Sequence, residues 1–288
     1  MNPALTHIHD TLRQLRSDLE KNIIGQTTLL DQLLITLFAG GHALIEGVPG
    51  LGKTKTIKTL ATILGYDCKR ISFTPDLLPS DLTGNEIYRP KEAKFEIRKG
   101  PIFTSILLAD EINRTPPKVQ SALLEAMEER QVTIGNETLE LPKPFFVIAT
   151  QNPLEHEGTY PLPEAELDRF LMKIIIEYPS ANDEKKILEQ SSHLRNSSIE
   201  TSTKITPEEL IEMQSYIAEN IRIDPKIYDY ISVLLEATRN RNTQSQNPEL
   251  EYGASTRGGI ALIRCARIAA LLDGRDFVMP EDIKSLVL

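Results

Sequence analysis

Cysteine is scarce in this 288-residue chain, which contains only Cys68 and Cys265. The two lie far apart, without the paired spacing of metal-ligand motifs, so a disulfide scaffold and a zinc site are disfavoured and a reducing interior is expected. Long apolar runs are also missing. The longest, near residues 33–39, is too short to span a bilayer, and the first thirty residues hold no apolar signal core. These absences predict a soluble, cytoplasmic protein.

Positive charge is in deficit, since 32 Lys and Arg residues face 41 Asp and Glu residues and the net charge is −9. This balance argues against nonspecific binding to nucleic acid or anionic lipid. No Ser-His-Asp arrangement, heptad run or internal repeat stands out. The hydrophobic content of 40% is enough to bury a sizeable core in one large or two modest domains.

The most informative stretch is GVPGLGKT at residues 47–54, which fits G-x-x-x-x-G-K-[ST] at every fixed position. A short apolar strand at 42–46 precedes it, and apolar residues at helical spacing follow over 53–64. In such a loop, backbone N–H groups surround a phosphate chain, Lys53 reaches the β and γ phosphates and Thr54 ligates Mg²⁺. A ligand-free glycine turn is the alternative. The predicted nucleotide-binding residues here are Gly47, Val48, Pro49, Gly50, Leu51, Gly52, Lys53, Thr54 and Lys55.

Two carboxylates end a second apolar stretch, ILLADE at residues 106–111. Four consecutive apolar residues are typical of a strand buried on both faces of a parallel sheet, and ligands bind beyond the carboxyl ends of such strands. Asp110 therefore suits a Mg²⁺ site, and Glu111 suits the general base that activates water. The alternative is an acidic pair that begins a solvated loop.

A third apolar strand, predicted at residues 145–150, is followed by Asn152. At the carboxyl end of a strand this side chain could orient the attacking water or contact the γ-phosphate. On the motif alone, an Asn-Pro turn is the alternative.

The order of the remaining elements predicts an α/β core with a parallel sheet, followed by a small all-helical domain. The core is placed at residues 1–190 with its N-terminal helix, a polar linker at 191–203 and the helical domain at 204–288. Two hairpins are expected, at 87–97 and 131–141, with a proline-rich connection at 74–81. Predicted helices are 4–21, 28–38, 53–64, 117–129, 183–189, 208–219, 225–238, 255–272 and one from 280; further strands are 68–73 and 172–177.

Together these motifs resemble the MoxR family of AAA+ ATPases over residues 20–288. The similarity rests on LIEGVPGLGKT (44–54), FTPDLLPSD (73–81), TQNP (150–153) and PLPEAELDRF (161–170). The resemblance implies a P-loop AAA+ fold whose parallel sheet carries helices on both faces, with a small helical lid after it.

The resemblance also implies roles for individual residues. Asp110 and Glu111 would be the Walker B pair and Asn152 the first sensor. Arg169 would be an arginine finger for a neighbouring subunit's nucleotide, with an exposed helix-end arginine as the alternative. Arg257 would be a second sensor from the lid, acting on its own or a neighbouring subunit's nucleotide, or else a surface arginine at a helix start. Near the adenine, the matching residues are Ile24 and Gly25.

The family implies Mg²⁺-dependent hydrolysis of ATP to ADP and phosphate by a homo-oligomeric ring, with a hexamer as the expected size. Such a ring remodels or matures a protein partner, and the family suggests a von Willebrand factor A-domain protein. The hairpins at 87–97 and 131–141 would face the pore or that partner. Two alternatives are a slow nucleotide-gated scaffold and a nucleic-acid motor, the latter disfavoured by the acidic balance.

Overall fold

The computed structural model describes residues 1–153, 158–192, 204–239 and 253–287. The chain divides into two compact units, Gln14–Ile211 and Met1–Arg13 together with Glu212–Leu288. This division differs from the predicted one, because helix α1 (Pro3–Asn22) begins in the smaller unit. There the side chain of Asn2 donates a hydrogen bond to the Tyr216 hydroxyl at 2.9 Å.

The predicted linker at 191–203 also begins too early, since helix α7 (Ala181–Ser192) extends past residue 191. The rest of that linker, residues 193–203, lies outside the described residues.

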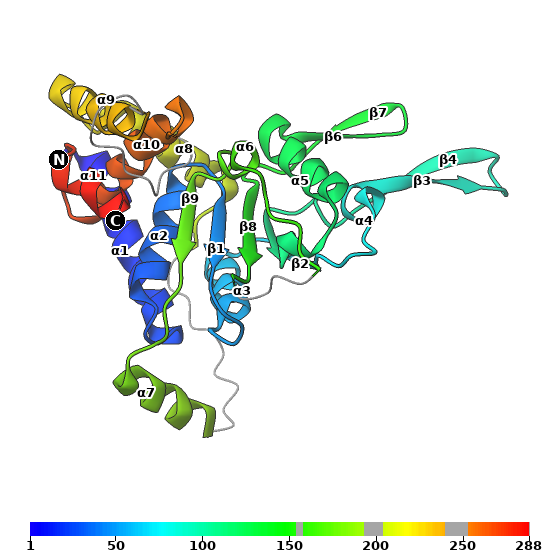
Figure 1. Cartoon of the computed structure of the whole chain (residues 1–288), viewed down its shortest axis with the longest axis horizontal. Coiled ribbons are helices and arrows are strands. Elements are labelled where there is room, and N and C mark those ends of the chain that lie inside the picture. Colours follow the sequence, from blue (N-terminus) through cyan, green and yellow to red (C-terminus); the bar gives the residue numbers. More distant parts are fainter. Residues whose placement is uncertain (154–157, 193–203, 240–252, 288) are drawn as a thin grey trace. The chain divides into compact units, whose positions relative to one another are not determined.

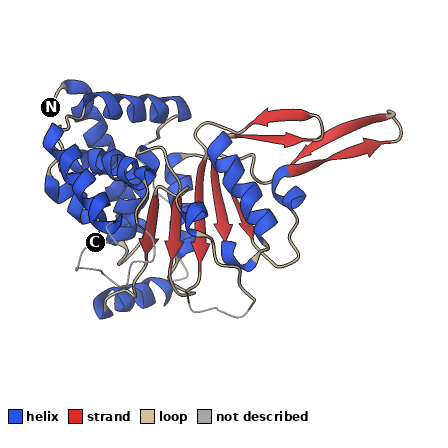
Figure 2. Ribbon diagram, turned by 45° about the horizontal axis from the view of Figure 1, so that its top comes forward, coloured by secondary structure: helices blue, strands red, loops and turns tan. Residues whose placement is uncertain are grey.

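A five-stranded parallel sheet forms the centre of the larger unit, in the order β2-β5-β8-β1-β9 (Figure 1). All five strands run the same way (Figure 2), so their carboxyl ends share one edge. The register pairs Glu46 with Gln151 and Ser72 with Asp110. The strands are β1 (Ala43–Glu46), β2 (Cys68–Ser72), β5 (Ile106–Asp110), β8 (Phe146–Gln151) and β9 (Met172–Ile175).

The three central strands are buried along almost their whole length, as expected of a parallel sheet that is covered on both faces. Leu107 and Val147 are fully buried and pack with Leu123 in one hydrophobic cluster. These observations confirm the predicted α/β core. Its other helices are α2 (Thr27–Phe38), α3 (Lys53–Leu64), α4 (Pro79–Thr83), the 3-10 helix η1 (Ile112–Arg114), α5 (Pro117–Glu129) and α6 (Glu164–Leu167).

Both predicted hairpins are present, each as a separate two-stranded sheet (Figure 2). The first pairs β3 (Gly84–Arg89) with β4 (Lys94–Lys99). Across this hairpin, the ring centroids of the exposed side chains Tyr88 and Phe95 lie 5.2 Å apart. The second pairs β6 (Gln131–Ile134) with β7 (Glu137–Glu140).

Helix α4 was not predicted, because the proline-rich stretch 74–81, which contains its first residue Pro79, was read as a loop. A proline at the first position of a helix is well tolerated, and the Asp81 carboxylate accepts a hydrogen bond from the Leu78 N–H at 2.9 Å.

The smaller unit is helical, as predicted. Helix α10 begins after Ser255, whose side chain accepts a hydrogen bond from the Gly258 N–H at 3.1 Å. The buried carboxylate of Asp282 binds the Arg275 guanidinium through both oxygens. The remaining helices are α8 (Pro207–Asn220), α9 (Pro225–Arg239), α10 (Thr256–Leu272) and α11 (Pro280–Val287). Within the described ranges, every helix is too short or too polar to cross a bilayer.

Candidate functional site

The glycine loop between β1 and α3 has the shape of an anion cradle. Gly50 and Gly52 have φ angles of +90° and +77°, a region that residues with a side chain rarely adopt. A Cβ atom added at either glycine would meet nothing within 4 Å, so open space lies beside the backbone. Helix α3 starts directly after Gly52 and presents its free N–H groups at this point. The loop therefore fits a phosphate chain.

Lys53 lies over this loop, where its ammonium donates a hydrogen bond to the Gly47 carbonyl oxygen. Burial lowers the pKa of Lys53, and the nearby carboxylates of Asp110 and Glu111 partly oppose that shift. The lysine is thus close enough to both acids to interact with them electrostatically. A phosphate chain in the loop would take the place of the carbonyl as the partner of the ammonium.

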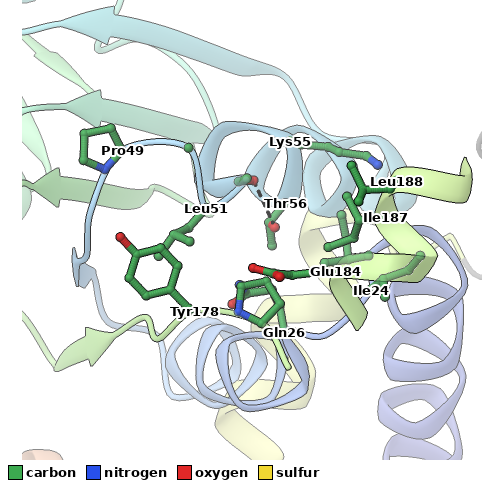
Figure 3. Close-up of a pocket in the computed structure, with 14 residues that line it drawn as sticks. Ile24, Gln26, Pro49, Leu51, Lys55, Thr56, Tyr178, Glu184, Ile187 and Leu188 are labelled. Carbon is green, nitrogen blue, oxygen red and sulfur yellow. Dashed lines mark hydrogen bonds between the residues drawn. The ribbon is translucent and has the colours of Figure 1, made fainter. Parts of the chain in front are cut away.

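A cavity of about 510 Å³ opens beside the glycine loop (Figure 3), which is in the usual size range for small-molecule sites. Tyr178 and Leu51 approach it from one side and Ile187 and Leu188 from another, and the Glu184 carboxylate lies between them. An apolar cavity with few polar groups suits a nucleobase. The lining residues are Ile23, Ile24, Gln26, Pro49, Gly50, Leu51, Gly52, Lys55, Thr56, Tyr178, Pro179, Glu184, Ile187 and Leu188.

Among the residues predicted near the base, Ile24 lines this cavity and Gly25 does not. Gly25 has a φ of +72°, and a Cβ there would come within 2.8 Å of the Asp183 Cβ. Gly25 therefore lets the turn between α1 and α2 pack closely on α7. Its neighbours Ile24 and Gln26 both line the cavity, and the place of Gly25 beside the adenine stays a prediction.

The two carboxylates at the end of β5, of its last residue Asp110 and of the next residue Glu111, are held by a hydrogen-bond network. Thr150 of β8 donates from its hydroxyl to Asp110 Oδ1 at 2.6 Å and accepts from the Glu111 N–H at 3.0 Å. Arg70 of β2 donates to Asp110 Oδ2 from Nη2 at 2.6 Å and from Nε at 3.1 Å. Glu111 pairs with Arg114 at 3.0 Å. Each acid is thus paired with an arginine of the same chain.

The donor set fits Mg²⁺ held jointly by protein and nucleotide. Among the described residues, no group of three or more His, Cys, Asp or Glu side chains is placed to hold a metal by itself. Mg²⁺ usually binds through one or two protein oxygens together with substrate phosphates, and the Thr54 hydroxyl and Asp110 carboxylate are hard oxygen donors of that kind.

The other predicted residues occupy different places. Asn152 directly follows β8, and its side chain is buried. Arg169 follows α6, and its Nε lies 3.0 Å from Glu128 Oε2; Arg169 does not line the cavity. Arg257 lies in the smaller unit, in the first turn of α10.

Comparison with known proteins places the chain in a family. Residues 42–172 match the model of the ATPase family associated with various cellular activities, and residues 243–288 match an AAA lid domain. Chaperone MoxR1 of Mycobacterium tuberculosis is 41% identical over 96% of this chain and 73% of its own length. This chain belongs to the MoxR family of AAA+ ATPases.

Two further comparisons agree with this assignment to the MoxR family. YeaC of Bacillus subtilis is 48% identical, over 97% of this chain and 85% of YeaC. A crystal structure described as that of an ATPase from Cytophaga hutchinsonii matches with a TM-score of 0.88 and 43% identity, over 98% of this chain and 86% of that one. The AAA+ fold and the assignment as an ATPase are therefore established.

Several residues of this MoxR ATPase site were missed from the sequence. Arg70 stands two residues before the end of its strand, and Thr150 begins the TQNP stretch but also ends an apolar run, so neither was singled out as a site residue. Their meeting at Asp110 depends on strand order, which one sequence does not give. Tyr178 and Glu184 reach the cavity from the segment after β9 and from α7, far from the glycine loop in sequence.

Proposed function

We propose that this protein hydrolyses ATP in a Mg²⁺-dependent reaction. The observation that supports this most strongly is the arrangement at the carboxyl edge of the sheet, where the open glycine cradle follows β1 and Asp110 and Glu111 stand at the end of β5, with β8 between the two strands. Lys53 and the loop amides would hold the phosphates, and Glu111 would take the proton of the attacking water, which Asn152 would orient. Thr54 and Asp110 would hold Mg²⁺, which neutralises charge on the phosphoryl oxygens.

Arg169 is proposed to complete the site of a neighbouring subunit in a homo-oligomeric ring, for which we expect a hexamer. It lies against Glu128 and does not line the cavity of its own chain, as required of a residue that acts on another subunit's nucleotide. An arginine presented in trans to the γ-phosphate contributes about 10³–10⁵ in rate. Arg257 is proposed as the second sensor, which the lid unit supplies.

The work done by the ring is proposed to be chaperone-like remodelling or maturation of a protein partner. The relative from M. tuberculosis carries the name chaperone, and the β3–β4 hairpin exposes the aromatic pair Tyr88 and Phe95. We propose a von Willebrand factor A-domain protein as the partner. Cytoplasmic action fits the two free thiols, Cys68 and Cys265.

A second candidate is a nucleotide-gated scaffold that binds its partner in the ATP state and turns over slowly. It is favoured by the pairing of both active-site acids with arginines, which would have to separate before each turnover.

Glu111→Gln tests the motor against the scaffold. The variant should bind ATP normally but release phosphate about 10²–10⁴ times more slowly, since it lacks the general base. Glu125→Gln makes the same charge change on the exposed face of α5 and serves as the control. Undiminished phosphate release from Glu111→Gln would contradict the assigned role, and undiminished partner remodelling by it would favour the scaffold.

Mixing Arg169→Ala with wild type tests the shared site. In a ring, the variant should poison turnover beyond its share of the subunits. Turnover that is first order in protein and simply proportional to the wild-type fraction would contradict the ring.

A further inference from the structure

Thr150 is placed between the two carboxylates and contacts both residues. Its side chain comes from β8, the strand next to β5, and is 1% exposed. Its single hydroxyl hydrogen goes to Asp110 Oδ1, at 2.6 Å. One lone pair of the same oxygen accepts the Glu111 N–H, at 3.0 Å. One buried hydroxyl thus fixes the side chain of the first acid and the backbone of the second.

The backbone of Glu111 needs such a partner because it adopts an unusual conformation. Its φ is +59°, in the left-handed region that is strained for residues other than glycine. In this conformation the chain turns sharply out of β5 into η1, which sets the direction of the Glu111 side chain. The hydrogen bond from the Glu111 N–H to Thr150 holds the start of that turn.

The hydroxyl differs from Arg70 in how it acts on Asp110. Arg70 brings a positive charge to Oδ2, where it would oppose a cation, whereas Thr150 orients Oδ1 without any charge. A neutral donor that satisfies one lone pair leaves the carboxylate negative and its second lone pair on that oxygen available. Thr150 can therefore stay in place when a metal binds.

We propose that Thr150 is a positioning residue that sets Asp110 for the metal and Glu111 for the attacking water. The inference rests on the proposed ATPase function and assigns a residue on which both acids depend. Thr150 does not itself contact nucleotide or metal in this role, and it acts only through its hydroxyl.

The test compares Thr150→Val, which keeps the shape and removes the hydroxyl, with Thr150→Ser, which keeps the hydroxyl. ADP binding is measured by calorimetry in EDTA and across a Mg²⁺ titration, and ATP turnover is measured at saturating Mg²⁺. Thr36→Val is the matched control, because Thr36 is also fully buried and its hydroxyl donates to the Gln32 carbonyl at 2.7 Å, away from both acids.

Thr150→Val should keep the wild-type affinity for ADP in EDTA, since the glycine loop is unchanged. The Mg²⁺ concentration at which half of the effect on ADP binding is reached, the Mg²⁺ midpoint, should rise at least about tenfold, which is the lower limit of the loss expected for one hydrogen bond to a charged group. ATP turnover should fall because kcat falls, whereas KM for ATP should change little. Thr150→Ser should have the Mg²⁺ midpoint and the kcat of wild type, and so should Thr36→Val. If Thr150→Val does not fold, Thr150→Cys, with its weak thiol donor, should give an intermediate midpoint.

A wild-type Mg²⁺ midpoint in Thr150→Val or Thr150→Cys would overturn the proposal. So would a serine variant as impaired as the valine variant, or an equal shift in Thr36→Val. If wild type itself bound no ADP under either condition, the ATPase proposal would fail first. If Mg²⁺ changed ADP binding in wild type and Thr150→Val had the same Mg²⁺ midpoint, only the proposed role of Thr150 would fail.

Discussion

Replacing Arg70 with glutamine should make the site bind Mg²⁺ more tightly. The guanidinium donates twice to Asp110 Oδ2, from Nη2 at 2.6 Å and from Nε at 3.1 Å. Those two bonds fill both acceptor positions of that oxygen, and the Thr150 hydroxyl takes one of the two on Oδ1. A metal or its bound water therefore finds one free position on the carboxylate, and Arg70 must withdraw to open the others.

The size of the effect follows from how exposed the pair is. The Arg70 side chain is 48% exposed and that of Asp110 is 16% exposed, so the pair is neither fully solvated nor buried. Exposed ion pairs contribute about 0–1 kcal/mol and hydrogen bonds to charged groups about 1.5–3 kcal/mol. A value of about 1–1.4 kcal/mol is appropriate between these ranges, and it corresponds to a five- to tenfold lower Mg²⁺ midpoint, at about tenfold per 1.4 kcal/mol.

The assay is a Mg²⁺ titration of fluorescent ADP binding at low and high salt. The gain in Arg70→Gln should shrink as salt rises, because screening already weakens the competing pair in wild type. Arg98→Gln removes the same charge from the exposed β3–β4 hairpin and should leave the midpoint unchanged. A midpoint that stays the same in Arg70→Gln would refute the competition. A raised midpoint would mean that Arg70 positions the acid instead.

Three further changes have defined outcomes. Lys53→Met should abolish detectable nucleotide binding in calorimetry, and retained affinity would remove Lys53 from the site. Gly41→Ala should lower the free energy of unfolding by about 1–3 kcal/mol in urea, because its Cβ would lie 2.4 Å from the Leu171 Cβ. Burial alone would raise the pKa of Glu46, but hydrogen bonds, the strongest from Lys173, hold it below its ordinary value. The ionised Glu46 side chain therefore stabilises the fold at pH values above its pKa in the unfolded chain, and this contribution to the free energy of unfolding is lost as the pH falls through its pKa in the folded protein. Glu46→Gln should accordingly lose less stability on acidification than wild type, as measured by urea unfolding at a series of pH values.

The elements that were predicted correctly depend on local pattern. An apolar run such as residues 106–109 or 146–149 can only be a buried strand or a buried helix segment, and its short length decides for the strand. The glycine loop is likewise recognisable because every fixed position of its motif performs a chemical task at a set spacing. Both features are complete within a few neighbouring residues.

The features that were missed depend on which segments meet in space. The close packing of Gly25 on Asp183 of α7 is one of them, because no pattern around residue 25 indicates that helix. The first residues of α1 group with the C-terminal helices for the same reason. The Met1 ammonium lies 3.7 Å from Asp276, a partner that is almost the whole chain away in sequence.

Strand order explains why Asp110 has two partners of opposite effect. Because β5 lies between β2 and β8, its last residue has Arg70 on one side and Thr150 on the other. The Arg70 charge competes with a metal, whereas the Thr150 hydroxyl prepares the carboxylate for it. Removing them singly should therefore move the Mg²⁺ midpoint in opposite directions, which general damage to the site would not do. Both bind one carboxylate, so the double variant should deviate from the sum of the single effects, and strict additivity would show that the two contacts act independently.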